Sequence, residues 1–172
     1  MNNKSEHMFE VLFVCTGNTC RSPMAEGILK KMLADRGVRN VKVSSAGTHG
    51  LLHAPASLFA IQVARAYEVD LSRHHSRELT PDMLLTADLI LAMSWEHIEH
   101  IKRMDEKAGG RTYLLKAFAR PLPVSNEDQR KGVLSIKDPI GGGLDDYERS
   151  FSEIAEEIER ILPELLRLVK RS

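Results

Sequence analysis

Residues 9–23 have the sequence FEVLFVCTGNTCRSP, and the first strand, loop and helix start of the chain are expected there. Residues 9–14 are rich in β-branched and aromatic types, which predicts a buried strand. A polar loop follows at 15–22. The pair Ser22-Pro23 then predicts a helix start, with Ser22 as N-cap and Pro23 at the first helical position. The loop is therefore expected between a strand end and a helix N-terminus.

The alternation of strand and helix continues along the chain. Further strands are expected at 41–45, 88–93 and 113–118. Helices are expected from 23 to Gly37, at 54–67, at 95–107 and from about 145 to 169, and a short helical stretch is expected to begin at Thr80. In the helix at 54–67 we expect Leu58, Ile61, Val63 and Ala64 to point inward. The helix at 95–107 is expected to end at the break Gly109-Gly110. The apolar stripe of the helix at 145–169 is Phe151, Ile154, Ile158, Ile161, Leu165 and Leu168. Residues 119–137 contain two prolines and many polar residues, so we expect a long surface loop there.

This order of elements predicts an α/β fold. Strand–helix alternation implies right-handed crossovers and a parallel sheet covered on both faces. We expect a single-domain doubly wound sandwich around a four-stranded parallel sheet, with a flexible tail at 1–9 and one domain at 10–172. In such sheets the working site lies beyond the carboxyl ends of the strands, where the loop 15–22 falls.

Composition excludes several classes of protein. The 172 residues suffice for one well-buried domain, and 24 Lys and Arg balance 24 Asp and Glu, which argues against a general basic surface for nucleic acid. No apolar run approaches the roughly 18 residues that span a bilayer, and the polar start MNNKSEHMFE lacks the core of a secretion signal. Two cysteines five positions apart form no disulfide framework. We expect a cytoplasmic protein without nucleic-acid or membrane partners.

The loop 15–22 has the composition of an oxyanion site. Gly17 and Asn18 tolerate positive φ, so the loop can curl and direct successive backbone N–H groups into one hollow. The helix N-terminus adds partial positive charge, and Arg21 can bind two oxygens of a phosphate-sized anion. Cys15 would lie at the floor of this cup, where positive surroundings lower a thiol pKa and favour the nucleophilic thiolate.

A thiolate attack on phosphorus also requires an acid for the leaving group. Asp138 is the best candidate, because it precedes Pro139 and the flexible run Gly141–Gly143 just before the last helix. Pro139 fixes the backbone, and the glycines allow the loop to approach the cup. An ordinary turn aspartate is the alternative interpretation of this residue.

The two motifs CTGNTCRSP at 15–23 and Asp138-Pro139 together resemble the low-molecular-weight protein tyrosine phosphatases, from about Val11 to the last helix. The resemblance implies the phosphatase I-like fold, a phosphocysteine intermediate on Cys15, and Asp138 as general acid and then general base. It implies phosphate binding by Arg21 and the loop amides, from Thr16, Gly17, Asn18, Thr19, Cys20, Arg21 and Ser22. It further implies a hydrogen-bonded network that supports the loop, made of Asn18, Ser22, Ser45 and His74, with His75 adjacent to the last.

Cys20 matches a second loop cysteine of that family, which can form a reversible disulfide with the nucleophile. The curled loop can bring Cys15 and Cys20 within disulfide reach, although their spacing alone does not prove it. No metal and no cofactor is expected. Phosphorylated proteins are the expected partners, and inorganic phosphate is the expected product.

The substrate class depends on two positions. Tyrosine-specific members commonly carry a bulky aliphatic residue before the second cysteine and an aromatic pair after Asp-Pro; here these positions hold Thr19 and Ile140-Gly141. Bacterial protein arginine phosphatases resemble this chain more closely, with Thr at the loop position and Asp-Pro-aromatic-Gly-Gly. Ile140 and the long loop 119–137 depart from that pattern. A guanidinium requires polar acceptors, whereas a phenyl ring gains from aromatic walls, so we favour phosphoarginine over phosphotyrosine.

Other readings of the same residues are weaker. Arsenate reductases share the C-x5-R loop, but their thiol relay requires cysteines downstream, and none follows Cys20. A zinc site lacks ligand spacing, and His97 and His100 are expected on a solvated helix face. A non-catalytic phosphopeptide-binding module would require Arg21 but neither Cys15 nor Asp138.

Overall fold

The computed structural model describes residues 8–121 and 124–172. Its centre is a parallel sheet of β1 (Phe9–Cys15), β2 (Val41–Gly47), β3 (Leu89–Ala92) and β4 (Thr112–Leu114), in the order β2-β1-β3-β4. The helices are α1 (Arg21–Asp35), α2 (Leu58–Ala66), α3 (Pro81–Thr86), α4 (Trp95–Met104), the 3-10 helix η1 (Glu106–Arg111), α5 (Asn126–Arg130) and α6 (Leu144–Arg171). The predicted α/β fold with a four-stranded parallel sheet is confirmed.

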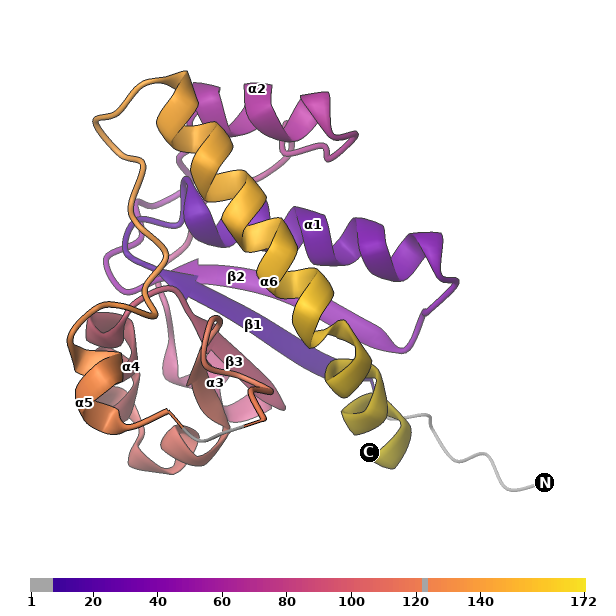
Figure 1. Ribbon diagram of the computed structural model, residues 1–172, viewed down its shortest axis with the longest axis vertical. Coiled ribbons are helices and arrows are strands. Elements are labelled where there is room, and N and C mark those ends of the chain that lie inside the picture. Colours follow the sequence, from indigo (N-terminus) through magenta and orange to yellow (C-terminus); the bar gives the residue numbers. More distant parts are fainter. Residues whose placement is uncertain (1–7, 122–123) are drawn as a thin grey trace.

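Strand β1 lies in the interior of the sheet because β2 and β3 pair with its two edges, and its side chains are buried on both faces. Val11 and Phe13 belong to the core that includes side chains of α1, α2 and α6, whereas Leu12 and Val14 pack with side chains of α3 and α4. Figure 1 shows α1, α2 and α6 on one side of the sheet and α3, α4 and α5 on the other. The sequential neighbour β2 pairs with one edge of β1 and β3 with the other, so the strand order reverses at β1. A ligand crevice is expected at the carboxyl end of such a strand.

Three expected element boundaries are wrong. The second helix begins at Leu58 instead of residue 54, because Ser57 caps it through the Ala60 N–H, and Leu58 is 83% exposed instead of inward. Strand β4 ends at Leu114, where the chain turns and Phe118 folds back on the core. The predicted break at 109–110 lies inside η1, which follows α4 after the capping residue Asp105.

The ends of the chain and the segment 119–137 also differ from expectation. β1 begins at Phe9, inside the expected tail, and residues 1–7 lie outside the described residues, as do 122–123. The segment 119–137 is not all loop, since it contains α5, where the Ser125 side chain accepts from the Asp128 N–H. Arg130 of α5 lies over the Trp95 ring, 5.4 Å from its centroid, which fastens the segment to α4.

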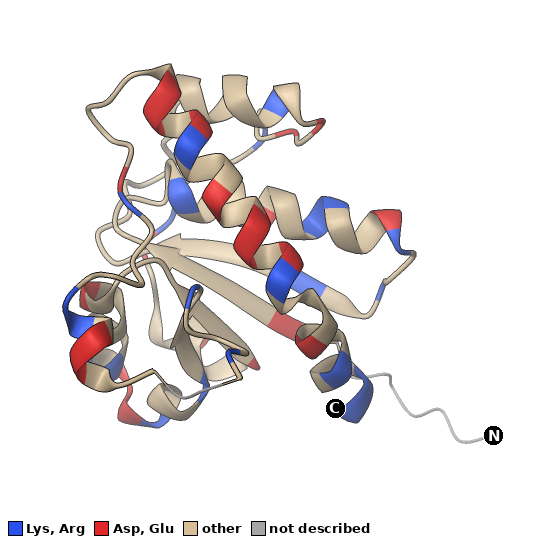
Figure 2. Ribbon diagram, in the orientation of Figure 1, with Lys and Arg blue, Asp and Glu red and all other residues tan. Residues whose placement is uncertain are grey.

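No helix among the described residues is long and apolar enough to cross a membrane. Figure 2 shows charged residues of both signs on most of the helices, and along α6 basic residues are interspersed among acidic ones and gather near its C-terminal end. This distribution agrees with the balanced composition of the chain.

Gly47, at the end of β2, lies against backbone atoms of the loops that follow β1 and β2. A Cβ there would overlap the Thr16 carbonyl oxygen and lie 2.9 Å from the Gly50 Cα, and both are backbone atoms with little freedom to move. We expect Gly47→Ala to lower the free energy of unfolding by about 1–3 kcal/mol, as overpacking does. Gly110→Ala is the control, because a Cβ at Gly110 meets nothing within 4 Å. Urea unfolding of both variants measures the effect, and equal stabilities would contradict the tight approach.

Candidate active site

The loop between β1 and α1 is curled by one residue in a left-handed conformation. Asn18 has φ of 55°, which asparagine tolerates better than most residues. The carbonyl oxygens of Cys15 and Thr16 accept from the N–H groups of Thr48 and His49, which ties the start of the loop to the end of β2. Helix α1 then begins at Arg21, so Cys20 occupies the N-cap position instead of the expected Ser22.

Asn18 is the centre of the hydrogen bonds that hold this loop. It is fully buried, and its Nδ2 donates to Ser22 Oγ at 2.8 Å and to Ser45 Oγ at 2.9 Å. Its backbone carbonyl oxygen lies 2.7 Å from His74 Nε2, and no contact of this kind joins His75 among the described hydrogen bonds. The structure therefore brings together all four residues expected in the supporting network, and Ser22 is used there instead of capping α1.

Two residues of this network, Arg77 and Glu26, could not be identified from the sequence. The Arg77 N–H donates to Asn18 Oδ1 at 3.0 Å, and Arg77 Nε donates to the Ser45 carbonyl oxygen at 2.9 Å. Ser45 Oγ in turn donates to Glu26 Oε2 at 2.5 Å. A lone arginine in a loop and a glutamate on a helix resemble solvated charges, so only the tertiary contacts identify them.

Cys15 lies buried at the last position of β1, with its Sγ 2.9 Å from Ser22 Oγ. Burial raises the pKa of the Cys15 thiol above its ordinary value, and this outweighs the lowering by the Ser22 hydrogen bond and the Arg21 charge. The lowered pKa expected from the loop composition is therefore wrong for this structure. The thiol is removed from water, and the positive charge of Arg21 is shared with an acid.

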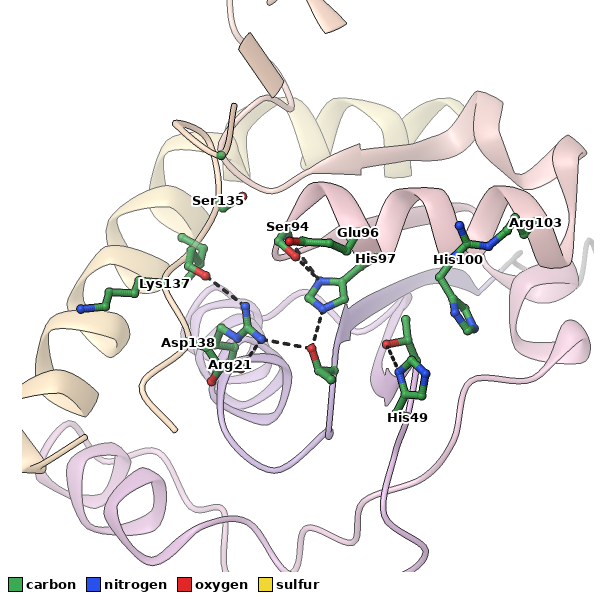
Figure 3. A pocket seen from close by; sticks show the side chains of 14 residues that line it. Arg21, His49, Ser94, Glu96, His97, His100, Arg103, Ser135, Lys137 and Asp138 are labelled. Carbon is green, nitrogen blue, oxygen red and sulfur yellow. Dashed lines mark hydrogen bonds and ion pairs between the residues drawn. The ribbon is translucent and has the colours of Figure 1, made fainter. Parts of the chain in front are cut away.

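That acid is Asp138. Arg21, 5% exposed, donates from Nη2 to Asp138 Oδ2 at 2.5 Å and from Nη1 to the Ile136 carbonyl oxygen at 3.1 Å. The contact brings the two motifs of the sequence together across 117 positions of the chain (Figure 3). Arg21 Nε is buried without a hydrogen-bond partner among the described residues. A buried donor of this kind is costly unless an acceptor reaches it, and an oxyanion would supply one.

The loop from Asp138 to Gly143, before α6, is shaped by turn residues. Asp138 Oδ1 accepts from the Ile140 N–H at 3.2 Å, and Gly141 has φ of 78°, a conformation that favours glycine. Asp138 is 36% exposed and thus reaches both Arg21 and solvent. The Ile140 side chain points into solvent and is 69% exposed, so it makes no wall of a buried site.

Thr19 and Cys20 lie on the side of the loop toward α2 and α6. Cys20 Sγ is 3.3 Å from the Tyr147 hydroxyl and 3.5 Å from Ser57 Oγ, and both cysteines are free. Thr19 Oγ1 lies 3.6 Å from Cys20 Sγ, and the Thr19 carbonyl oxygen accepts from the Ser57 N–H. The structure thus places Thr19 beside the second cysteine.

His97 is a site residue that sequence reasoning missed, because it was expected on a solvated helix face. It is 3% exposed, and its Nε2 lies 2.9 Å from Thr16 Oγ1 in the loop. Burial and the nearby Arg21 charge lower the pKa of His97 to about 3. The i, i+3 spacing of His97 and His100 indicated only a polar helix face, whereas the crossing of α4 past the loop turns the first of them inward.

A pocket of about 580 Å³ opens beside the loop (Figure 3). One wall comes from Thr16 and Arg21 of the loop and the start of α1, together with Asp138 from the segment before α6. The opposite wall comes from α4. The remaining lining residues of the pocket are Thr48, His49, Ser94, Glu96, His97, His100, Arg103, Gly132, Ser135, Ile136 and Lys137. The segment 119–137 therefore contributes the third wall through its last residues. Among the described residues no group of three or more His, Cys, Asp or Glu is arranged to hold a metal ion.

Arg21, with its unsatisfied donor, and the Asp138 carboxylate line this pocket, whereas the buried Cys15 lies in the same loop, at the end of β1, and is not among the lining residues. A cysteine, an arginine and a carboxylate in this arrangement define a class of site, the cysteine-based phosphatases. The sequence model of the low molecular weight phosphotyrosine protein phosphatase family matches residues 10–172. The chain belongs to this family, as its motifs indicated, and is a cysteine-based phosphatase.

Relatives in the family carry two kinds of name. The protein-arginine-phosphatase of Bacillus subtilis strain 168 is 33% identical over 91% of this chain and 96% of its own length. The low molecular weight protein-tyrosine-phosphatase Etp of Escherichia coli K12 is 45% identical, over 60% of this chain and 67% of its own. A solved YwlE arginine phosphatase, a cysteine-to-serine mutant with a phosphorylated active site serine, has a TM-score of 0.80 at 30% identity, with 91% of this chain and 95% of that one covered.

The lowered pKa of His97 makes stability depend on pH. Between pH 6.5 and about 3 the unfolded chain binds a proton at His97 that the folded protein does not, so the free energy of unfolding falls as the pH falls through this range. Arg21, His100 and His49 favour the neutral form, and Glu96 opposes them. We expect wild type to lose more stability between pH 7.5 and 5 than His97→Gln, as measured by urea unfolding. Equal losses would contradict a buried neutral His97.

Proposed function

We propose that this phosphatase hydrolyses phosphoarginine in proteins through a phosphocysteine on Cys15. The observation that carries the substrate class is the lining of the pocket beside Arg21. Its described lining residues include the carboxylates of Glu96 and Asp138 and the hydroxyls of Thr16, Thr48, Ser94 and Ser135, with no Phe, Tyr or Trp. Carboxylates and hydroxyls accept the N–H groups of a guanidinium, whereas a phenyl ring gains from aromatic walls.

The similarity to known phosphatases is compatible with phosphoarginine and also with phosphotyrosine. The arginine phosphatase relative matches nearly the whole chain at 33% identity, and a tyrosine phosphatase relative matches a similar share at 30%. A further tyrosine phosphatase relative matches a shorter part at 45% identity. Phosphotyrosine is the second candidate, favoured by that local identity.

The proposed reaction has two steps. The Cys15 thiolate attacks phosphorus, the P–N bond breaks, and Asp138 gives its proton to the departing guanidine nitrogen. Asp138 then takes a proton from water, whose oxygen attacks phosphorus, so that the S–P bond breaks and inorganic phosphate leaves. Arg21 holds the phosphoryl oxygens in both steps, since its buried Nε provides a free donor.

The role of Asp138 is tested with two leaving groups. We expect Asp138→Asn to lower kcat on phenyl phosphate by about 10²–10⁴-fold, and to cost less on p-nitrophenyl phosphate, whose leaving group departs without protonation. Cys15→Ala is the blank, because a serine at the equivalent position in a relative becomes phosphorylated. Equal losses on both substrates would contradict acid catalysis and indicate that Asp138 acts only through its ion pair with Arg21.

The substrate class is tested with matched phosphoarginine and phosphotyrosine peptides. We expect a higher kcat/KM on phosphoarginine, and a shift of the ratio toward phosphotyrosine in Thr19→Ile, which replaces a polar group by a bulky aliphatic one. Thr86→Ile is the matched control, because Thr86 is exposed at the end of α3, away from the loop. A preference of the wild type for phosphotyrosine would refute the proposed substrate, and an unchanged ratio in Thr19→Ile would refute a role for Thr19.

A further inference from the structure

A chain of hydrogen bonds runs from the start of α4 to the catalytic loop. The Ser94 N–H donates to His97 Nδ1 at 3.1 Å, and His97 Nε2 lies 2.9 Å from Thr16 Oγ1. Arg21 Nη2 donates to the same Thr16 oxygen at 3.4 Å. Figure 3 shows the imidazole of His97 between Ser94 and the loop, with Arg21 on the other side. None of the sequence motifs includes α4 in the site.

The direction of these bonds follows from the tautomer of His97. A backbone N–H only donates, so Nδ1 is the acceptor of the Ser94 N–H. A neutral imidazole has one acceptor and one donor nitrogen, which places the proton of His97 on Nε2. His97 therefore donates to Thr16 Oγ1. The neutral form is the stable one here, because burial and Arg21 lower the pKa of His97 to about 3.

The Thr16 hydroxyl still has its proton available for one hydrogen bond. Its hydroxyl oxygen accepts from His97 and from Arg21, which uses both lone pairs, so its own proton is available to an acceptor. Thr16 is exposed and lines the pocket together with Arg21 and Asp138. An acceptor that enters this pocket beside Arg21 meets the Thr16 proton as well.

We propose that the Thr16 hydroxyl donates a hydrogen bond to a phosphoryl oxygen of the substrate, and that His97 is the positioning residue that fixes its direction. This inference rests on the proposed function, since it adds a donor to the same oxyanion site. Without the His97 donor, the Thr16 hydroxyl turns to other partners and its contact with Arg21 loosens. The α4 wall thus takes part in binding the anion through Thr16.

The experiment measures the Kd of inorganic phosphate by calorimetry and kcat/KM on p-nitrophenyl phosphate. We expect Thr16→Val to weaken phosphate binding and lower kcat/KM by about ten- to hundredfold, the loss of one hydrogen bond to a charged group. Thr16→Ser keeps the hydroxyl and stays within about threefold of wild type by the same reasoning. Because Thr16 is exposed, urea unfolding of these variants is expected to match wild type.

A double-mutant comparison of Thr16 and His97 distinguishes a positioning role of His97 from a general effect on stability. We expect His97→Leu to cost about tenfold in both constants, and His97→Gln to recover most of it, because the glutamine amide replaces the Nε2–H donor. The double variant Thr16→Val with His97→Leu is expected to match Thr16→Val alone, since His97 acts through Thr16. Glu99→Gln, an exposed change on α4, is the control without effect.

Three results would overturn this inference: an unchanged phosphate Kd in Thr16→Val, effects of the two residues that multiply in the double variant, or a His97→Gln as impaired as His97→Leu. The proposed function fails by a different result, namely turnover by wild type no faster than by Cys15→Ala. Phosphate calorimetry does not depend on turnover, so the Thr16 and His97 comparison is decided in either case.

Discussion

The buried amide of Asn18 is the constraint on which the active-site loop depends. The residue is held at positive φ, a conformation that persists in a non-glycine residue only where its surroundings determine it. Its side chain and carbonyl oxygen supply those surroundings by bonding to four residues from α1, β2 and the segment before α3: Ser22, Ser45, His74 and Arg77. The loop is thus held in its curled shape by the protein itself, which reduces the reorganisation needed when an anion binds.

Arg21 is the residue that determines the charge balance of the site. Its guanidinium is shared among Asp138, the Ile136 carbonyl and Thr16, and one of its donors has no partner among the described residues. Asp138 forms an ion pair with Arg21, and burial raises the pKa of the Cys15 thiol although the Arg21 charge lowers it. In the proposed mechanism, a phosphoryl group that binds Arg21 would free the Asp138 carboxyl for the leaving group. Under the proposed mechanism this ion pair links anion binding to acid catalysis.

Local patterns in the sequence were enough to predict the fold and the two motifs. Residues 9–14 are apolar enough to identify a central strand, and the Cys15 loop and Asp138-Pro139 identify the family. Prediction failed where tertiary contacts outweigh local signals. His97 lies among charged residues on α4 and is nonetheless buried, because the helix crosses the loop. The pKa of Cys15 is raised mainly by burial, and Arg21 binds a partner 117 residues away, neither of which spacing reveals.

The direct test of a phosphocysteine is to trap it. Under the proposed mechanism Asp138→Asn lacks the base for the second step, so a rapid acid quench during turnover of p-nitrophenyl phosphate is expected to catch phosphate on the chain. Peptide mapping by mass spectrometry is predicted to place that phosphate on Cys15 and to find none in the variant that also carries Cys15→Ala. Turnover with phosphate on another residue, or with no phosphoenzyme at any quench time, would contradict nucleophilic catalysis by Cys15.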